Sequence, residues 1–393
     1  MPRLEHVGIA TSDLAATVAT VQQLLGLAPY KTERVEREGV ATHFLDTGAK
    51  LELLEATAPE SPVAKFVERK GPGLHHLAFD VDDLDATFAR LKDAGVPLLA
   101  DAPKTGADGK RIFFVHPKAT HGVLVEFCAD DPDALPIPTF VSHDGAEIAT
   151  YAFGSEARPP LLLLHGAGGS TRTETLALAR SLQTDFRIVA FDLPGHGQSG
   201  EADAEAPITF ERMQAATGAV LDALGWDRAT LAGYSFGGAI ALFFAAQHPA
   251  RVERLVAHAT NVFWDEAMVR AMAKRLNVPA LQRRADLWAV LDASHGGRAV
   301  ALFPRVAAFS ATIPAFRGEA ERLVGQVACP TLLTAGDRDD MFPLDATLAL
   351  HAALPGAALG VLPGLRHRLD ANAARRVAAE WKTWLRGQAT AVR

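Results

Sequence analysis

The first third of the chain contains the same pattern twice, and this repeat constrains its fold most. LEHVGIATSDL at residues 4–14 aligns with LHHLAFDVDDL at residues 74–84. Each copy runs from an alternating apolar segment, typical of a half-buried strand, through an Asp-Leu pair into a helical pattern that ends near Gly26 or Gly95. A later strand-like segment carries Glu52 in the first copy and Glu126 in the second. The repeat predicts two β-α-β-β-β units, which form a duplicated α+β domain.

A proline-rich segment separates this repeat from the rest of the chain. CADDPDALPIPTF at residues 128–140 has no apolar periodicity, which is typical of a linker. Beyond it, segments such as PPLLLLHGAGG and ATLAGYSFGG indicate buried strands followed by glycine-rich turns and helices, as in the parallel sheet of an α/β fold. We therefore predict a first domain over residues 1–130, a linker over 131–139 and a second domain over 140–393. Residues 261–325, which are helical and rich in Phe, Trp and Met, form the predicted helical cap.

Composition excludes several functions. The formal net charge of −7 leaves no basic surface of the kind that nucleic acids require. The two cysteines, Cys128 and Cys329, cannot build a disulfide framework, which fits a reducing compartment. The N-terminus lacks the apolar segment of a signal peptide, and the longest apolar runs are too short to span a bilayer. We expect a cytoplasmic protein with no membrane partner.

A nucleophile elbow dominates the second domain. Gly233-Tyr234-Ser235-Phe236-Gly237 has the form GxSxG between a predicted strand and a predicted helix. A serine hydroxyl is a weak nucleophile until a base takes its proton, and His367, after the last predicted strand, is the candidate base. The chain order of serine, acid and histidine favours an aspartate after the preceding strand. Asp339 fits the G-x-x-D spacing, with Asp337 and Asp340 as rivals.

The same domain offers donors for an oxyanion. The loop His165-Gly166-Ala167-Gly168-Gly169 follows the first core strand, so Gly166 or Ala167 is expected to supply one amide, and Phe236 the other. One such donor contributes about 3–4 kcal/mol to transition-state stabilisation. We expect His165 and His196 to be structural and His295 of the cap to lie in a solvated loop.

Residues 140–393 resemble an α/β-hydrolase with a cap domain, from the entry strand to the catalytic histidine. The resemblance implies a serine hydrolase that acts on a small-molecule acyl ester, thioester or lactone without a cofactor. Hydrolysis of carbon–carbon bonds stays open, because the same triad serves both reactions and the cap selects the substrate.

The repeated positions of the first domain bring two histidines and two glutamates to matching strands. His6, Glu52, His76 and Glu126 are a suitable ligand set for one divalent metal ion, and Co, Mn, Ni and Zn all accept such ligands. His76 is preferred to His75 because it aligns with His6, whereas His75 is expected on the other face of its strand.

Residues 1–130 resemble the vicinal-oxygen-chelate superfamily and, within it, the methylmalonyl-CoA epimerases. LEHVGIA, SPVAKFVERKG, GLHHLAFDVDD and HPKATHGVLVEF carry the resemblance. It implies metal-assisted proton transfer beside the thioester of an acyl-CoA, with Glu126 as a ligand and a candidate base, and a domain that can form a homodimer. Some members carry a second carboxylate three residues after the glycine of an E-x-G-V stretch, where this chain has Thr42. The alternatives are therefore a bifunctional enzyme, or a hydrolase whose first domain is a non-catalytic binding or dimerisation module.

Overall fold

The structure is a computed structural model that describes residues 2–45, 50–107, 109–131, 134–203 and 205–390. The chain divides into two compact units, Met1–Ala134 and Leu135–Arg393, each built on one eight-stranded sheet. Residues 132 and 133 of the predicted linker lie outside the described residues.

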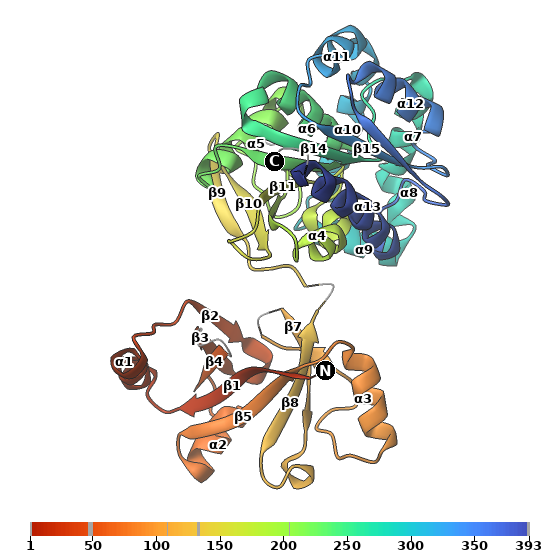
Figure 1. Cartoon of the computed structure of the whole chain (residues 1–393). Helices are drawn as coiled ribbons and strands as arrows, with labels where there is room; N and C mark the ends of the chain where they lie inside the picture. Colours follow the sequence, from red (N-terminus) through yellow and green to blue (C-terminus); the bar gives the residue numbers. More distant parts are fainter. Residues whose placement is uncertain (1, 46–49, 108, 132–133, 204, 391–393) are drawn as a thin grey trace. The chain divides into compact units, whose positions relative to one another are not determined.

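The sheet of the N-terminal unit has the strand order β2-β3-β4-β1-β5-β8-β7-β6 (Figure 1). At its centre β1 and β5 are antiparallel neighbours, and each has a parallel partner on its other side, β4 and β8. The order β-α-β-β-β occurs twice, which confirms the predicted duplication. The elements are β1 (Arg3–Thr11), α1 (Leu14–Leu25), β2 (Lys31–Val35), β3 (Val40–Leu45), β4 (Lys50–Ala56), α2 (Pro62–Lys70), β5 (Gly73–Asp80), α3 (Leu84–Asp93), β6 (Lys104–Thr105), β7 (Lys110–Val115) and β8 (Leu124–Asp130).

The repeated Asp-Leu pairs start the two equivalent helices. The Asp13 carboxylate accepts a hydrogen bond from the amide of Ala16, and the Asp83 carboxylate accepts one from Ala86. Each aspartate is therefore the N-cap of its helix, which explains why the pair recurs at this point of both copies.

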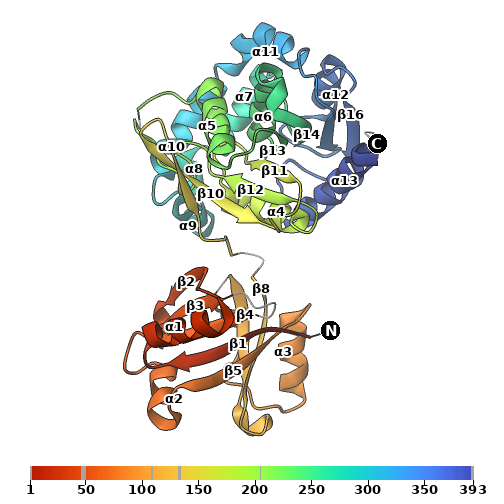
Figure 2. The same cartoon turned by 60° about the vertical axis from the view of Figure 1, so that its left-hand side comes forward.

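The C-terminal unit has the strand order β16-β15-β14-β13-β11-β12-β10-β9, parallel from β16 to β12 and antiparallel at β10 and β9. Helices cover both faces (Figure 2). Buried side chains of α4 and α13 form one hydrophobic cluster, and those of α5 and α6 belong to another. The strands are β9 (Thr139–His143), β10 (Ala146–Phe153), β11 (Pro160–Leu164), β12 (Arg187–Phe191), β13 (Ala229–Tyr234), β14 (Val252–His258), β15 (Thr331–Gly336) and β16 (Ala358–Leu362), and the covering helices are α4 (Leu176–Leu182), α5 (Phe210–Ala223), α6 (Phe236–Gln247), α12 (Leu344–Ala353) and α13 (Ala371–Thr390).

A helical insertion lies between β14 and β15. Its buried side chains, among them Met268, Met272 and Phe303, join the same cluster as α5 and α6, so the insertion is packed onto the sheet domain. Its helices are α7 (Glu266–Arg275), α8 (Val278–Gln282), α9 (Ala285–Ser294), α10 (Ala299–Ser310) and α11 (Arg317–Val324).

Candidate active sites

The turn between β13 and α6 holds Ser235 in an unusual backbone conformation. Its φ of 52° and ψ of −117° lie in a region that costs a non-glycine residue about 1–3 kcal/mol. Glycines permit the tight turn. A Cβ at Gly233 would lie 2.4 Å from the amide nitrogen of Gly238, and one at Gly237 would lie 2.4 Å from the carbonyl oxygen of Leu164. Strand and helix thus approach closely, and Ser235 stands at the carboxyl end of the sheet.

The three residues of the predicted triad lie in contact. Ser235 Oγ is 3.2 Å from His367 Nε2, and His367 Nδ1 is 3.0 Å from Asp339 Oδ2. All three are buried. The rivals lie elsewhere: the exposed Asp340 accepts only from the backbone amide of His367, at 3.4 Å, and Asp337 accepts from the amide of Gly364.

Backbone amides fix the Asp339 carboxylate. Its Oδ1 accepts hydrogen bonds from the amides of Met341 at 2.8 Å and Phe342 at 2.7 Å. Burial alone would raise the pKa of Asp339, but the hydrogen bonds from His367 and from these amides lower it below its ordinary value. The carboxylate is therefore ionised, and its other oxygen is directed at the imidazole.

Two backbone amides near Ser235 have no acceptor. Among the described residues, neither the amide of Ala167 nor that of Phe236 donates a hydrogen bond. The amide of Gly166 is different, because it donates to Glu174 Oε2 at 2.7 Å. Ala167 and Phe236 are therefore the better candidates for an oxyanion site, since such donors must be free to bind the substrate oxygen.

Glu174 was not found by sequence reasoning. A Cβ on Gly169 would lie 2.1 Å from its carboxylate, so the glycine-rich loop wraps closely around this side chain. Burial raises the pKa of Glu174 to about 7, against the opposing charge of Arg275. No sequence pattern marks this residue, because its role depends on a contact with the loop.

Three histidines tie this loop to its surroundings. His165 Nε2 accepts from the amide of Leu193 at 2.9 Å, and His196 Nε2 faces the amide of Gly168 at 3.4 Å. His295 Nδ1 accepts from the amide of Gly197 at 2.8 Å, and the ring is fully buried. The expected solvated position of His295 is therefore wrong, because the imidazole bonds the cap to the loop after β12.

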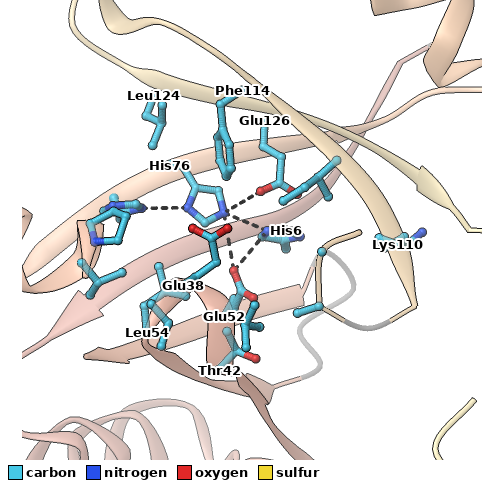
Figure 3. A pocket seen from close by; sticks show the side chains of 18 of the residues that line it. His6, Glu38, Thr42, Glu52, Leu54, His76, Lys110, Phe114, Leu124 and Glu126 are labelled. Carbon is cyan, nitrogen blue, oxygen red and sulfur yellow. Dashed lines mark hydrogen bonds and ion pairs between the residues drawn. The ribbon is translucent and has the colours of Figure 1, made fainter. Parts of the chain in front are cut away.

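In the N-terminal unit the four predicted ligand residues converge in one cavity of about 410 Å³ (Figure 3). His6 Nε2 lies 2.9 Å from His76 Nε2, and Glu52 Oε2 lies 3.2 Å from His6 Nε2. Glu126 Oε2 lies 3.6 Å from His76 Nε2. All four side chains are buried.

These donors fit a divalent metal ion. Two ligand atoms about 2.1 Å from one ion lie about 3.0 Å apart at right angles and about 3.4 Å apart in a tetrahedron, which is the range found here. Buried polar groups without a partner are costly, and the two imidazole Nε2 atoms face each other. An ion between them would satisfy both nitrogens and balance both carboxylates.

The pKa values reflect how closely these groups are packed. Burial alone would lower the pKa of His6, but hydrogen bonds to Glu5 and Glu52 outweigh it and raise the pKa to about 10. Burial and the nearby charge of His6 lower the pKa of His76 well below its ordinary value. Burial raises the pKa of Glu126 to about 8. Without a metal, the cluster therefore holds protons that a cation would displace.

Two strand irregularities shape the site. In the β1–β5 ladder the register shifts between Leu4 and His6 and again between Gly8 and Ile9, so that Glu5 and His75 have no partner in the pairing. A bulged residue turns its side chain from the regular alternation. His75 therefore lines the same cavity as His76, contrary to the expectation that it lies on the other face. Glu5 likewise reaches the cavity, where it bonds to His6 Nδ1.

Gly8 provides room for His76. The two residues are partners across the β1–β5 ladder, and a Cβ on Gly8 would lie 2.2 Å from Cε1 of the His76 ring. Any other residue at this position would displace the imidazole.

Comparison with known proteins adds the families. Residues 5–114 match the Glyoxalase/Bleomycin resistance protein/Dioxygenase superfamily, and residues 159–298 match the alpha/beta hydrolase fold. The ethylmalonyl-CoA/methylmalonyl-CoA epimerase of Cereibacter sphaeroides is 39% identical over 127 residues, which are 32% of this chain and 95% of that protein. The human mitochondrial methylmalonyl-CoA epimerase is 37% identical over 126 residues, 32% of this chain and 72% of that protein. The chain is a fusion of a glyoxalase-superfamily domain with an α/β-hydrolase domain.

A solved structure supports the fold of the hydrolase domain. The crystal structure of a putative lipase from Acinetobacter baumannii superposes with a TM-score of 0.58 and 19% identity, and covers 66% of this chain and 94% of that one. At this identity the likeness extends to the fold alone.

Within the described residues, no single helix of the fusion is long and apolar enough to cross a membrane. One bent pair, α10 with the segment Ile313–Val324, reaches the required length and composition, with a bend of 42°. Apolar side chains of both parts, such as Phe303 and Leu323, are buried in the core of the hydrolase domain.

Proposed function

We propose that the chain is a bifunctional enzyme, a serine hydrolase joined to a metal-dependent epimerase that acts on acyl-CoA. The proposal is supported most by the Ser235–His367–Asp339 contacts for the first activity and by the convergence of two imidazoles and two carboxylates for the second.

In the hydrolase, Ser235 Oγ would attack the substrate carbonyl while His367 Nε2 takes its proton. Asp339 holds the proton of His367 at Nδ1, so that Nε2 is free to act as the base. The amides of Ala167 and Phe236 would bind the negative oxygen of the tetrahedral intermediate. His367 then returns the proton to the leaving group, and water repeats the sequence to release the acid.

In the epimerase, His6, Glu52, His76 and Glu126 would hold a divalent cation. When bound, the cation supplies a Lewis acid that draws electrons from the thioester carbonyl and so acidifies the neighbouring carbon. Glu126 would exchange a proton with that carbon, and the apolar part of the cavity, with Phe114 and Leu124, excludes water. The relatives named above are epimerases of methylmalonyl-CoA, which makes this thioester the first substrate to test.

The hydrolase activity is tested with a panel of p-nitrophenyl esters. Replacement Ser235→Ala should abolish turnover, whereas Ser155→Ala, an exposed serine of the same domain, should leave it unchanged. Turnover that survives in Ser235→Ala would disprove the assigned nucleophile.

The epimerase activity is tested with single epimers of methylmalonyl-CoA and added Co²⁺ or Mn²⁺. Glu126→Ala should lower the rate by about 100-fold or more, as expected for the loss of an acid–base group. Glu55→Ala, on the same sheet but with a side chain that is 44% exposed, is the matched control. A wild-type chain that binds no metal would favour a non-catalytic binding or dimerisation module.

A further inference from the structure

We propose that Glu38 is a second proton-transferring carboxylate of the N-terminal site, opposite Glu126. This inference rests on the proposed epimerase function. Inversion at a carbon requires that a proton leaves from one face and another arrives at the opposite face, which two fixed groups achieve without turning the substrate.

Four glutamates line the cavity among the described residues, and three of them are already engaged. Glu52 and Glu126 belong to the ligand cluster. Glu5 bonds to His6 Nδ1 and accepts from Lys50 Nζ at 2.8 Å, so it orients a ligand. Glu38 is the remaining carboxylate at the cavity wall.

Glu38 and Glu126 approach from opposite halves of the sheet. Glu38 ends the short 3₁₀ turn Glu36–Glu38 that leads into β3, whereas Glu126 lies on β8. In the sheet order, β4, β1 and β5 separate β3 from β8. Figure 3 shows Glu126 above and Glu38 below the imidazole of His76. A substrate carbon held beside the cluster would have one carboxylate on each side.

Thr42 does not supply this second group. It lines the cavity from β3, but its hydroxyl donates to the carbonyl oxygen of Glu33 at 3.2 Å, and a threonine hydroxyl is not a base at neutral pH. Glu38 forms an ion pair with Lys104, with Oε1 2.5 Å from Nζ. This pair favours the ionised carboxylate, the form that can accept a proton. Lys104 is therefore a positioning residue for Glu38.

The proton transfers balance without a further reactant. With one epimer, Glu38 takes the proton from the α-carbon, and the electron pair is delocalised into the thioester. Glu126 then gives a proton to the opposite face, and the roles reverse for the other epimer. The two carboxylates regain their starting states when they exchange protons with solvent after product release.

The test uses the full chain loaded with Co²⁺ and each methylmalonyl-CoA epimer, deuterated at the α-carbon. Wild type should invert both epimers and release deuterium from both. Glu38→Gln should lower inversion by about 100-fold or more, yet still release deuterium from the one epimer whose α-deuterium faces Glu126. Glu36→Gln, the exposed glutamate of the same turn, should behave as wild type.

Metal uptake separates a proton-transfer role from a structural one. Cobalt titration, followed by its visible absorption, should give the same affinity for Glu38→Gln as for wild type. Loss of cobalt binding in Glu38→Gln, or inversion at the wild-type rate, would overturn the assignment. Inactivity of the cobalt-loaded wild type towards both epimers would instead refute the proposed epimerase function itself.

Discussion

The replacement Asp339→Asn tests the hydrolase site most sharply, because the structure fixes how the new amide group would lie. The amides of Met341 and Phe342 both donate to Oδ1, so the side-chain oxygen of asparagine must take that position. The NH₂ group then occupies the place of Oδ2, 3.0 Å from His367 Nδ1. Since NH₂ can only donate, Nδ1 must accept and the imidazole proton moves to Nε2.

In that tautomer His367 has no lone pair for the hydroxyl of Ser235. In triads of this kind, the same substitution lowers kcat about 10⁴-fold, which corresponds to about 5 kcal/mol of transition-state stabilisation. We expect a loss of this size in the rate at which a fluorophosphonate labels Ser235, measured by intact mass. This probe requires no knowledge of the natural substrate.

Asp340→Asn is the matched control, because it removes the same charge from the adjacent, exposed residue. Its only printed-sequence neighbour in the triad is Asp339, and its carboxylate accepts a single long hydrogen bond from the amide of His367. We expect labelling within about threefold of wild type, as for an ordinary surface substitution. The reasoning fails if Asp339→Asn labels within tenfold of wild type, or if Asp340→Asn loses as much.

Three further predictions follow from the two sites. Gly8→Ala should displace the His76 ring and lower cobalt affinity about 10- to 100-fold, and unchanged affinity would contradict the close contact. Because the pKa of Glu174 rises from 4.5 to about 7 on folding, wild type loses stability as the pH rises through this range. Glu174→Gln still accepts from Gly166 and does not ionise, so its Tm should exceed that of wild type far more at pH 8 than at pH 5, and an equal difference at both would disprove the shift. Removal of metal by a chelator should abolish epimerisation and leave fluorophosphonate labelling of Ser235 intact, and loss of both would show that the activities are not independent.

The sequence predicted the elements whose signals are local or repeated. The strand–serine–helix context located Ser235, and the duplicated His and Glu positions identified His6, Glu52, His76 and Glu126 before their distances were known. The Asp-Leu pairs marked the helix starts, because an N-cap acts over three residues. In each case the information lies within a few residues or recurs at a fixed offset.

Other residues of the sites depend on contacts that no local pattern encodes. Glu174 meets the Gly166 amide only because the loop folds back upon it, and Glu38 reaches the cavity only because β3 lies beside β4 in the sheet. The positions of Glu5 and His75 were missed for another reason. A bulge breaks the two-residue alternation on which sequence reasoning depends, and its location is set by pairing between distant strands.

The central β1–β5 ladder has a consequence for how the N-terminal domain could be divided. The first copy contributes His6 and Glu52, the second contributes His76 and Glu126, and only their pairing creates a complete chelate. A peptide that stops after α2 would carry half of the donors, and so would a peptide that begins at β5. Tight cation uptake by a mixture of two such peptides would therefore report fragment complementation, with the ion acting as the clasp between them.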